Sequence, residues 1–187
     1  MSELVRPMYR GRMRWPAHSL RFACHAGWEL FASDKVKNSF IRCLDRTRTQ
    51  IGVDLWAFNV MPDHVHVLLW PHRDVASMAK IAEAIRDPME NAGLKQGVIP
   101  APPFWDMGAP FHEKTEDVRL VHEIMRRIHD NPVRAGLVET EEDWSYSSYR
   151  FWKNLPHVPL EMDVTVPRLD EQDPDIFPGP PSAQPIT

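Results

Sequence analysis

The sequence predicts an α+β fold, a ferredoxin-like split βαβ sandwich in which an antiparallel sheet carries helices on one face. Three observations indicate this class. Short segments rich in strand formers alternate with longer segments of helical periodicity, in the order strand, helix, strand, strand, helix, strand, helix. Two neighbouring strands, 53–60 and 64–70, are joined by a short turn and form a hairpin. No internal repeat divides the 187 residues, so we expect one globular unit.

The first half of the chain supplies four of these elements. Residues 18–25 place apolar side chains at alternate positions and predict a half-buried strand. Segment 33–50 opens with serine and aspartate as capping candidates and predicts a helix that Gly52 ends. Its apolar side is formed by Val36, Phe40, Ile41 and Leu44. Strand 53–60 is rich in strand-forming residues, and the turn MPDH leads into the second strand of the hairpin.

The second half supplies a helix, a strand and a further helix. The first helix is expected over 75–85, with Pro88 disrupting its end. A short strand or irregular segment is expected over 103–114. The last helix is expected over 115–130, with Thr115 near its cap and two acids in its first turn. The Asn-Pro pair that follows ends this helix, because the residue before a proline is pushed out of the helical region.

Composition divides the chain into three regions. Residues 1–17 are a basic N-terminal arm, 18–155 are the folded domain, and 156–187 are an acidic, proline-rich tail. The tail holds eight prolines, six acids and one arginine, a composition that breaks helices and cannot join a central sheet. We therefore expect the tail to be mostly disordered. The rest of the chain, with 21 basic and 20 acidic side chains, is near neutral.

The arginines of the first 21 residues lie next to aromatic side chains, a pattern that suits a phosphate backbone and exposed bases. A solvated basic end is the alternative. The candidate DNA-binding residues are Arg10, Arg12, Arg14, Trp15 and, after the last helix, Arg134.

The sequence also limits the class of protein. No run of 18 apolar residues exists, and charges occupy the N-terminal positions where a secretory signal has its apolar segment. We expect a soluble, cytoplasmic protein without a membrane partner. Cys24 and Cys43 are isolated thiols, which suit neither a disulfide framework nor a four-thiolate zinc site.

The strongest chemical signal is a pair of histidines in the second strand of the hairpin. Residues i and i+2 of a strand point to the same face, so His64 and His66 present two imidazoles side by side. Two nitrogen ligands make half of a metal site. Two histidines that simply form hydrogen bonds at a sheet surface are the alternative. Asp63 is placed to orient the His64 ring by accepting its other N–H, or is a turn residue.

The stretch around these histidines resembles a known motif. MPDHVHVLLWP, residues 61–71, is similar to the HUH motif (histidine, bulky hydrophobic residue, histidine) of single-tyrosine insertion-sequence transposases and of REP-associated tyrosine transposases. IHDNPVRAGLVETEEDWSYSSYR, 128–150, resembles the segment that follows the catalytic helix in the REP-associated branch. WDMGAPFHEKTED, 105–117, resembles the strand that enters that helix. With the arginine-rich start, the resemblance covers about residues 6–152.

The resemblance implies a DNA transposase that cleaves and transfers single strands. In such enzymes Mg²⁺ or Mn²⁺ is held by the two histidines and by an amide or acid of the last helix. That position falls on Asn131 here, so the implied metal ligands are His64, His66 and Asn131. An asparagine that caps its own helix turn is the alternative for this residue. The implied partner is single-stranded or hairpin DNA. Insertion-sequence relatives act as homodimers and REP-associated ones as monomers, and the sequence favours neither.

One residue departs from the family pattern. The family places its nucleophilic tyrosine four residues before the amide, and Arg127 occupies that position. A guanidinium has no available lone pair, so Arg127 cannot attack phosphorus but can bind a phosphate. Tyr146 and Tyr149 are the substitute candidates, if the chain after Pro132 returns to the active face.

Four hypotheses therefore stay open. The chain is a catalytically lapsed transposase relative that still binds DNA, an active strand-transferase with another tyrosine, or a nuclease in which a metal-activated water attacks. The fourth hypothesis, from another class, is a protein-interaction module whose acidic tail makes the contact. The near-neutral core gives no strong electrostatic signal for DNA.

Overall fold

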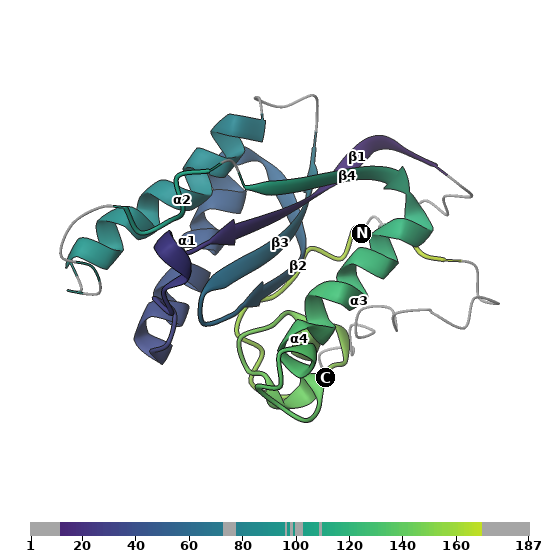
Figure 1. Ribbon diagram of the computed structural model, residues 1–187. Coiled ribbons are helices and arrows are strands. Elements are labelled where there is room, and N and C mark those ends of the chain that lie inside the picture. Colours follow the sequence, from purple (N-terminus) through teal and green to yellow (C-terminus); the bar gives the residue numbers. More distant parts are fainter. Residues whose placement is uncertain are drawn as a thin grey trace, which may run out of the picture.

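The computed structural model describes residues 12–72, 78–95, 97, 99, 103–108 and 110–169. Its centre is one antiparallel sheet of order β2-β3-β1-β4, formed by β1 (Arg12–Ala23), β2 (Val53–Val60), β3 (His64–Pro71) and β4 (Phe111–Asp117). Strand β3 lies between β1 and β2, and β1 lies between β3 and β4, as two split βαβ units require (Figure 1). The predicted fold class is confirmed.

Three longer helices pack on this sheet: α1 (Asp34–Ile51), α2 (Met78–Lys95) and α3 (Val118–Arg134). A short α4 (Tyr149–Trp152) and two 3-10 turns (His25–Gly27 and Glu141–Asp143) complete the described elements. None of the described helices combines the length and apolar character needed to cross a membrane.

One detail differs from the prediction, because the helices cover both faces of the sheet. Helices α1 and α2 lie on one side and α3 lies on the other (Figure 1). Phe22 of β1 contacts Trp105, whose ring also contacts Phe40 of α1. On the opposite face, Asn131 of α3 reaches His64 of β3. All eight residues of β2 are buried, as expected for a strand covered on both sides.

Both prolines that were expected to end helices lie inside them. Pro88 is within α2 and Pro132 is within α3, and each leaves the carbonyl four residues earlier without its helix donor. A buried side chain from a neighbouring element replaces the missing donor in each case. Thr47 Oγ1 of α1 donates to Ala84 O (3.1 Å), and Asn59 Nδ2 of β2 donates to Ile128 O (2.7 Å). These tertiary hydrogen bonds explain why the two predicted helix ends were wrong.

Two further boundaries also differ. Strand β1 begins at Arg12, so part of the predicted N-terminal arm belongs to the sheet. Helix α3 is capped by Asp117, whose carboxylate accepts from Arg119 N (2.8 Å), and not by Thr115, which is buried in β4. A carboxylate at the helix start satisfies free N–H groups as well as a hydroxyl does, so sequence spacing alone could not choose between the two residues.

The C-terminal segment 155–169, which from residue 156 onward was predicted to be disordered, packs along the free edge of β2. Asp163 N donates to Leu55 O (3.1 Å), and the Asp163 carboxylate accepts from Leu55 N (2.8 Å). Trp56 Nε1 donates to Thr165 Oγ1 (2.9 Å), and Met162 and Val166 are buried. The prolines do not prevent this, because the segment pairs only locally with an edge strand. The rest of the predicted tail lies outside the described residues.

Candidate metal and nucleic-acid site

Strand β3 places the two imidazoles as its alternation predicts. The rings of His64 and His66 lie on the same face with centroids 5.0 Å apart and planes at 83°. Val65, between them, is fully buried against the opposite layer. Because Asn131 of α3 reaches His64, the pair lies on the face of the sheet that α3 covers. Helix α1 lies on the other side of the sheet (Figure 1).

Both ring nitrogens of His64 have a partner. The Nδ1–H group donates to Asp63 Oδ1 (2.6 Å), and Asn131 Nδ2 lies 3.0 Å from His64 Nε2. Asp63 thus orients the ring so that its Nε2 atom faces the amide on α3. Burial lowers the pKa of His64, and the hydrogen bond to Asp63 partly opposes this effect.

His66 is held in its neutral form more strongly. Burial lowers its pKa to about 3, and the positive charges of Arg21 and Arg127 and the His64 ring act in the same direction. Two neutral imidazoles and one carboxamide are a donor set that a divalent cation accepts. Among the described residues, no three His, Cys, Asp or Glu side chains form a metal-binding group, so a three-ligand site depends on the Asn131 amide.

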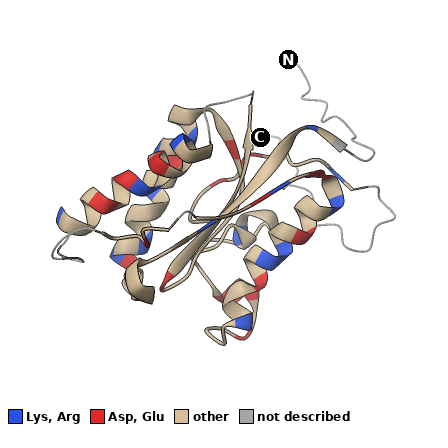
Figure 2. Cartoon of the chain, turned by 45° about the horizontal axis from the view of Figure 1, so that its top comes forward, with Lys and Arg blue, Asp and Glu red and all other residues tan. Residues whose placement is uncertain are grey.

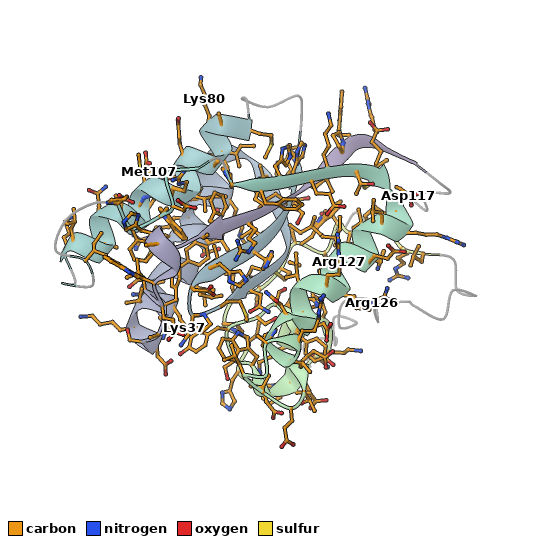
Figure 3. The ribbon with its side chains drawn as sticks, viewed as in Figure 1. Lys37, Lys80, Met107, Asp117, Arg126 and Arg127 are labelled. Atoms are coloured by element: carbon orange, nitrogen blue, oxygen red, sulfur yellow. The ribbon has the colours of Figure 1, made fainter. Side chains whose placement is uncertain are left out.

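Arg127 stands one turn before Asn131 on α3 (Figure 3). Its Nη2 atom lies 2.7 Å from Glu113 Oε2 on β4, and its side chain is 54% exposed. This ion pair holds the guanidinium near enough to His66 for its charge to affect that ring, and it leaves other N–H groups toward solvent. The position can therefore bind an anion but cannot supply a nucleophile.

The described contacts of the two substitute tyrosines involve neither the histidine pair nor Asn131. Tyr146 lies beside the first turn of α1, where Lys37 Nζ is 4.6 Å from its ring centroid. Tyr149 packs edge-on against His129 with centroids 5.7 Å apart. Burial raises the pKa of both phenols, which disfavours the phenolate that attacks phosphorus.

The predicted basic residues are only partly described. Arg10 and the side chain of Arg12 lie outside the described residues. Arg14 is exposed and lies over the Trp15 ring at 5.3 Å, and Arg134 is exposed with Asp130 at 3.9 Å. Basic and acidic positions are intermixed along the helices (Figure 2), in agreement with the near-neutral charge of the domain.

Sequence reasoning did not assign Arg21 to the site. Arg21 of β1 pairs with His66 of β3 in the sheet, so the two side chains leave the same face. Beside it lies a cavity of about 270 Å³ whose lining includes Arg86, Trp105 and the 64% exposed Phe111. Only the strand register reveals this neighbourhood, because Arg21 and His66 are far apart in the sequence.

Buried histidines make the stability of the protein depend on pH. Burial lowers the pKa of His18 to about 4 and the pKa of His129 to about 3. Between these pKa values and about pH 6.5, the histidines of the unfolded chain bind protons that those of the folded chain do not. The free energy of unfolding is therefore highest above about pH 6.5 and falls as the pH decreases. We expect a loss of up to about 1.4 kcal/mol per pH unit for each such histidine.

Urea unfolding at pH 7.5, 6 and 5 measures this loss. His129→Gln, which can keep a hydrogen bond to Ser148, should reduce the slope below pH 6.5. His157→Gln is the control, because this side chain is exposed. Equal slopes for all three proteins would contradict the prediction.

Comparison with known proteins shows a relationship in fold. The chain is similar to a solved structure of a REP-associated tyrosine transposase bound to a REP hairpin, with a TM-score of 0.62 and 17% sequence identity. The similarity covers 88% of this chain and 93% of that chain. At this level of identity it establishes a common fold. No protein-family model matches the chain, and no curated protein sequence matches it either.

Proposed function

We propose that the chain is a transposase-like protein that binds single-stranded or hairpin DNA at a divalent-metal HUH site and does not form a covalent DNA intermediate. One observation carries the proposal: His64, His66 and Asn131, from β3 and α3, lie together on one face of the sheet. The similarity in fold to a hairpin-bound transposase supports the same ligand class for this face.

His64, His66 and Asn131 would hold Mg²⁺ or Mn²⁺, with the amide turned so that its oxygen faces the ion. When bound, the ion would polarise a phosphate of the DNA. Asp63 keeps the His64 ring in the tautomer whose Nε2 atom carries a lone pair and no hydrogen. The low pKa of His66 keeps its ring unprotonated at neutral pH.

The cations around the histidines would contact the DNA backbone. Arg127 offers its remaining N–H groups to a phosphate, and Arg21 lies beside His66 on the same face. The exposed ring of Phe111, at the start of β4, is a surface on which an unpaired base can stack. Together these side chains suit a single strand better than a duplex, whose bases are already stacked.

We expect affinity for a hairpin oligonucleotide with single-stranded flanks to fall steeply as salt rises from about 50 to 200 mM, because phosphate contacts release counterions. Fluorescence anisotropy measures the slope of log K against log salt. Arg127→Gln and Arg14→Gln should each weaken binding and reduce that slope by about 0.7 to 0.9. Arg46→Gln, an exposed arginine of α1 on the other side of the sheet, is the matched control.

Two outcomes would contradict the proposed function. Binding that is absent at low salt, or that does not change with salt, would favour the protein-interaction hypothesis. Equal effects of Arg46→Gln and Arg127→Gln on DNA affinity would mean that DNA does not contact the face of the sheet that carries His64 and His66.

A further inference from the structure

Asn59 of β2 is a fully buried polar side chain beside the proposed site. It pairs with His66 of β3 in the sheet, so both side chains leave the same face. Its Nδ2 atom donates to Ile128 O of α3 over 2.7 Å. Its Oδ1 atom has no hydrogen-bond partner in the part of the chain that the structure describes. A buried acceptor without a partner costs free energy, so its presence needs an explanation.

The Nδ2 contact compensates for a proline. In a regular helix Ile128 O would accept from the N–H of residue 132, but Pro132 has none. Asn59 supplies the donor instead, and the bond links β2 to the helix turn that carries Asn131. The same side chain is therefore next to one proposed ligand, His66, and bound to the turn that positions another, Asn131.

The Oδ1 atom is suited to a second role. A histidine that binds a metal through one ring nitrogen is usually oriented by an acceptor at the other ring N–H. His64 has such an acceptor in Asp63, whereas His66 has none among the described residues. Asn59, with its unpartnered oxygen, is the residue paired with His66 on the neighbouring strand, and its side chain leaves the same face, which makes this oxygen a candidate for that acceptor.

We propose that Asn59 is a positioning residue for the metal site. Its Nδ2 group fixes the turn of α3 that carries Asn131, and its Oδ1 atom accepts the ring N–H of His66 when the other ring nitrogen holds a divalent cation. This inference rests on the proposed function, because it assigns the two neighbours of Asn59 as ligands.

The test compares Asn59→Ala with a matched control in the same protein. Thr47→Val removes the equivalent side-chain donor at the other helix proline, Pro88 in α2, away from the histidines. Calorimetric titration with Mn²⁺ should show affinity weakened at least about 10-fold in Asn59→Ala. Thr47→Val should lower the melting temperature about as much as Asn59→Ala does. It should leave the Mn²⁺ affinity within about twofold of that of the natural protein, because the Thr47 hydroxyl bonds α2 and not the metal site.

A second variant separates the two roles of Asn59. In Asn59→Ala/Pro132→Ala, the new N–H of residue 132 can donate to Ile128 O and replace the lost bond from Asn59. This double variant should therefore fold even if Asn59→Ala alone does not. We expect this double variant to regain only part of the Mn²⁺ affinity, because the acceptor for His66 is still missing. Full recovery would overturn the role of Oδ1, and equal affinities of Asn59→Ala and Thr47→Val would overturn the proposal as a whole.

Amide hydrogen exchange, measured in the metal-free protein, tests the role of Asn59 separately from the proposed metal binding. The Ala135 amide donates to Asn131 O (2.9 Å) and reports on the end of α3. Its exchange should be at least about 10-fold faster in Asn59→Ala, unchanged in Thr47→Val and slow again in the double variant. If the natural protein binds no Mn²⁺, the proposed metal site is wrong. Unchanged exchange in Asn59→Ala would show that Asn59 does not hold this turn.

Discussion

Arg127→Tyr is expected to form a covalent adduct with a single-stranded hairpin substrate in the presence of Mn²⁺, whereas the natural protein forms none. Position 127 is one helical turn before Asn131. A phenol placed there would therefore face the phosphate that the proposed metal ion would polarise. The guanidinium of Arg127 stays protonated and cannot attack. A labelled oligonucleotide that migrates with the protein on a denaturing gel measures the adduct.

Three variants sharpen this experiment. Adding His64→Ala to Arg127→Tyr should abolish the adduct, because the Lewis acid is lost. Arg126→Tyr is the matched control, since it places the same phenol on a neighbouring position of α3 that points elsewhere around the helix (Figure 3). Adding Glu113→Gln to Arg127→Tyr removes the carboxylate left without its ion-pair partner, which would otherwise repel DNA. This addition should raise the adduct yield.

The remaining outcomes distinguish the open hypotheses. An adduct from the natural protein that maps to Tyr146 or Tyr149 would mean that the nucleophile lies elsewhere in the chain. Cleavage without an adduct would mean that water attacks. No adduct from Arg127→Tyr, with Mn²⁺ binding intact, would mean that the site differs from an active one by more than this residue.

A chain that ends at Asn154 should lose about 4–9 kcal/mol of stability, which is comparable with the whole stability of many domains. Met162 and Val166 are buried, and removing each costs about 1.5–3 kcal/mol. The amide of the fully buried Leu55 also loses its acceptor on Asp163, at about 1–3 kcal/mol. The edge of β2 would then be open to pairing with other chains, so we also expect aggregation.

Urea unfolding and light scattering measure these two effects. A chain that ends at Leu169 keeps the contacts of the segment 155–169 and is the matched control. Among full-length variants, Asp163→Ala should cost about 1–3 kcal/mol, and Glu161→Ala, an exposed acid two residues away, should cost less than about 0.5 kcal/mol. A truncated chain as stable as the control would show that the segment does not protect β2.

The local pattern of the chain determined most of the elements. The strand 53–60 was predicted with its observed bounds, and the helix over 33–50 lies within a residue of α1. Both have strong periodic or compositional patterns and clear ends, such as Gly52 with its left-handed φ of 69°. The shared face of His64 and His66 follows from strand alternation alone, and it holds in the structure.

Tertiary contacts decided the rest. Pro88 and Pro132 stay inside helices because Thr47 and Asn59, distant in sequence, supply donors to the carbonyls that the prolines leave free. The segment 155–169 is ordered because the edge of β2 offers it backbone partners. Local sequence patterns describe only the bonds that a segment can make with itself. The sequence by itself therefore determined most of the elements and the face of the two histidines, while the packed sheet decided where helices end and which side chains meet there.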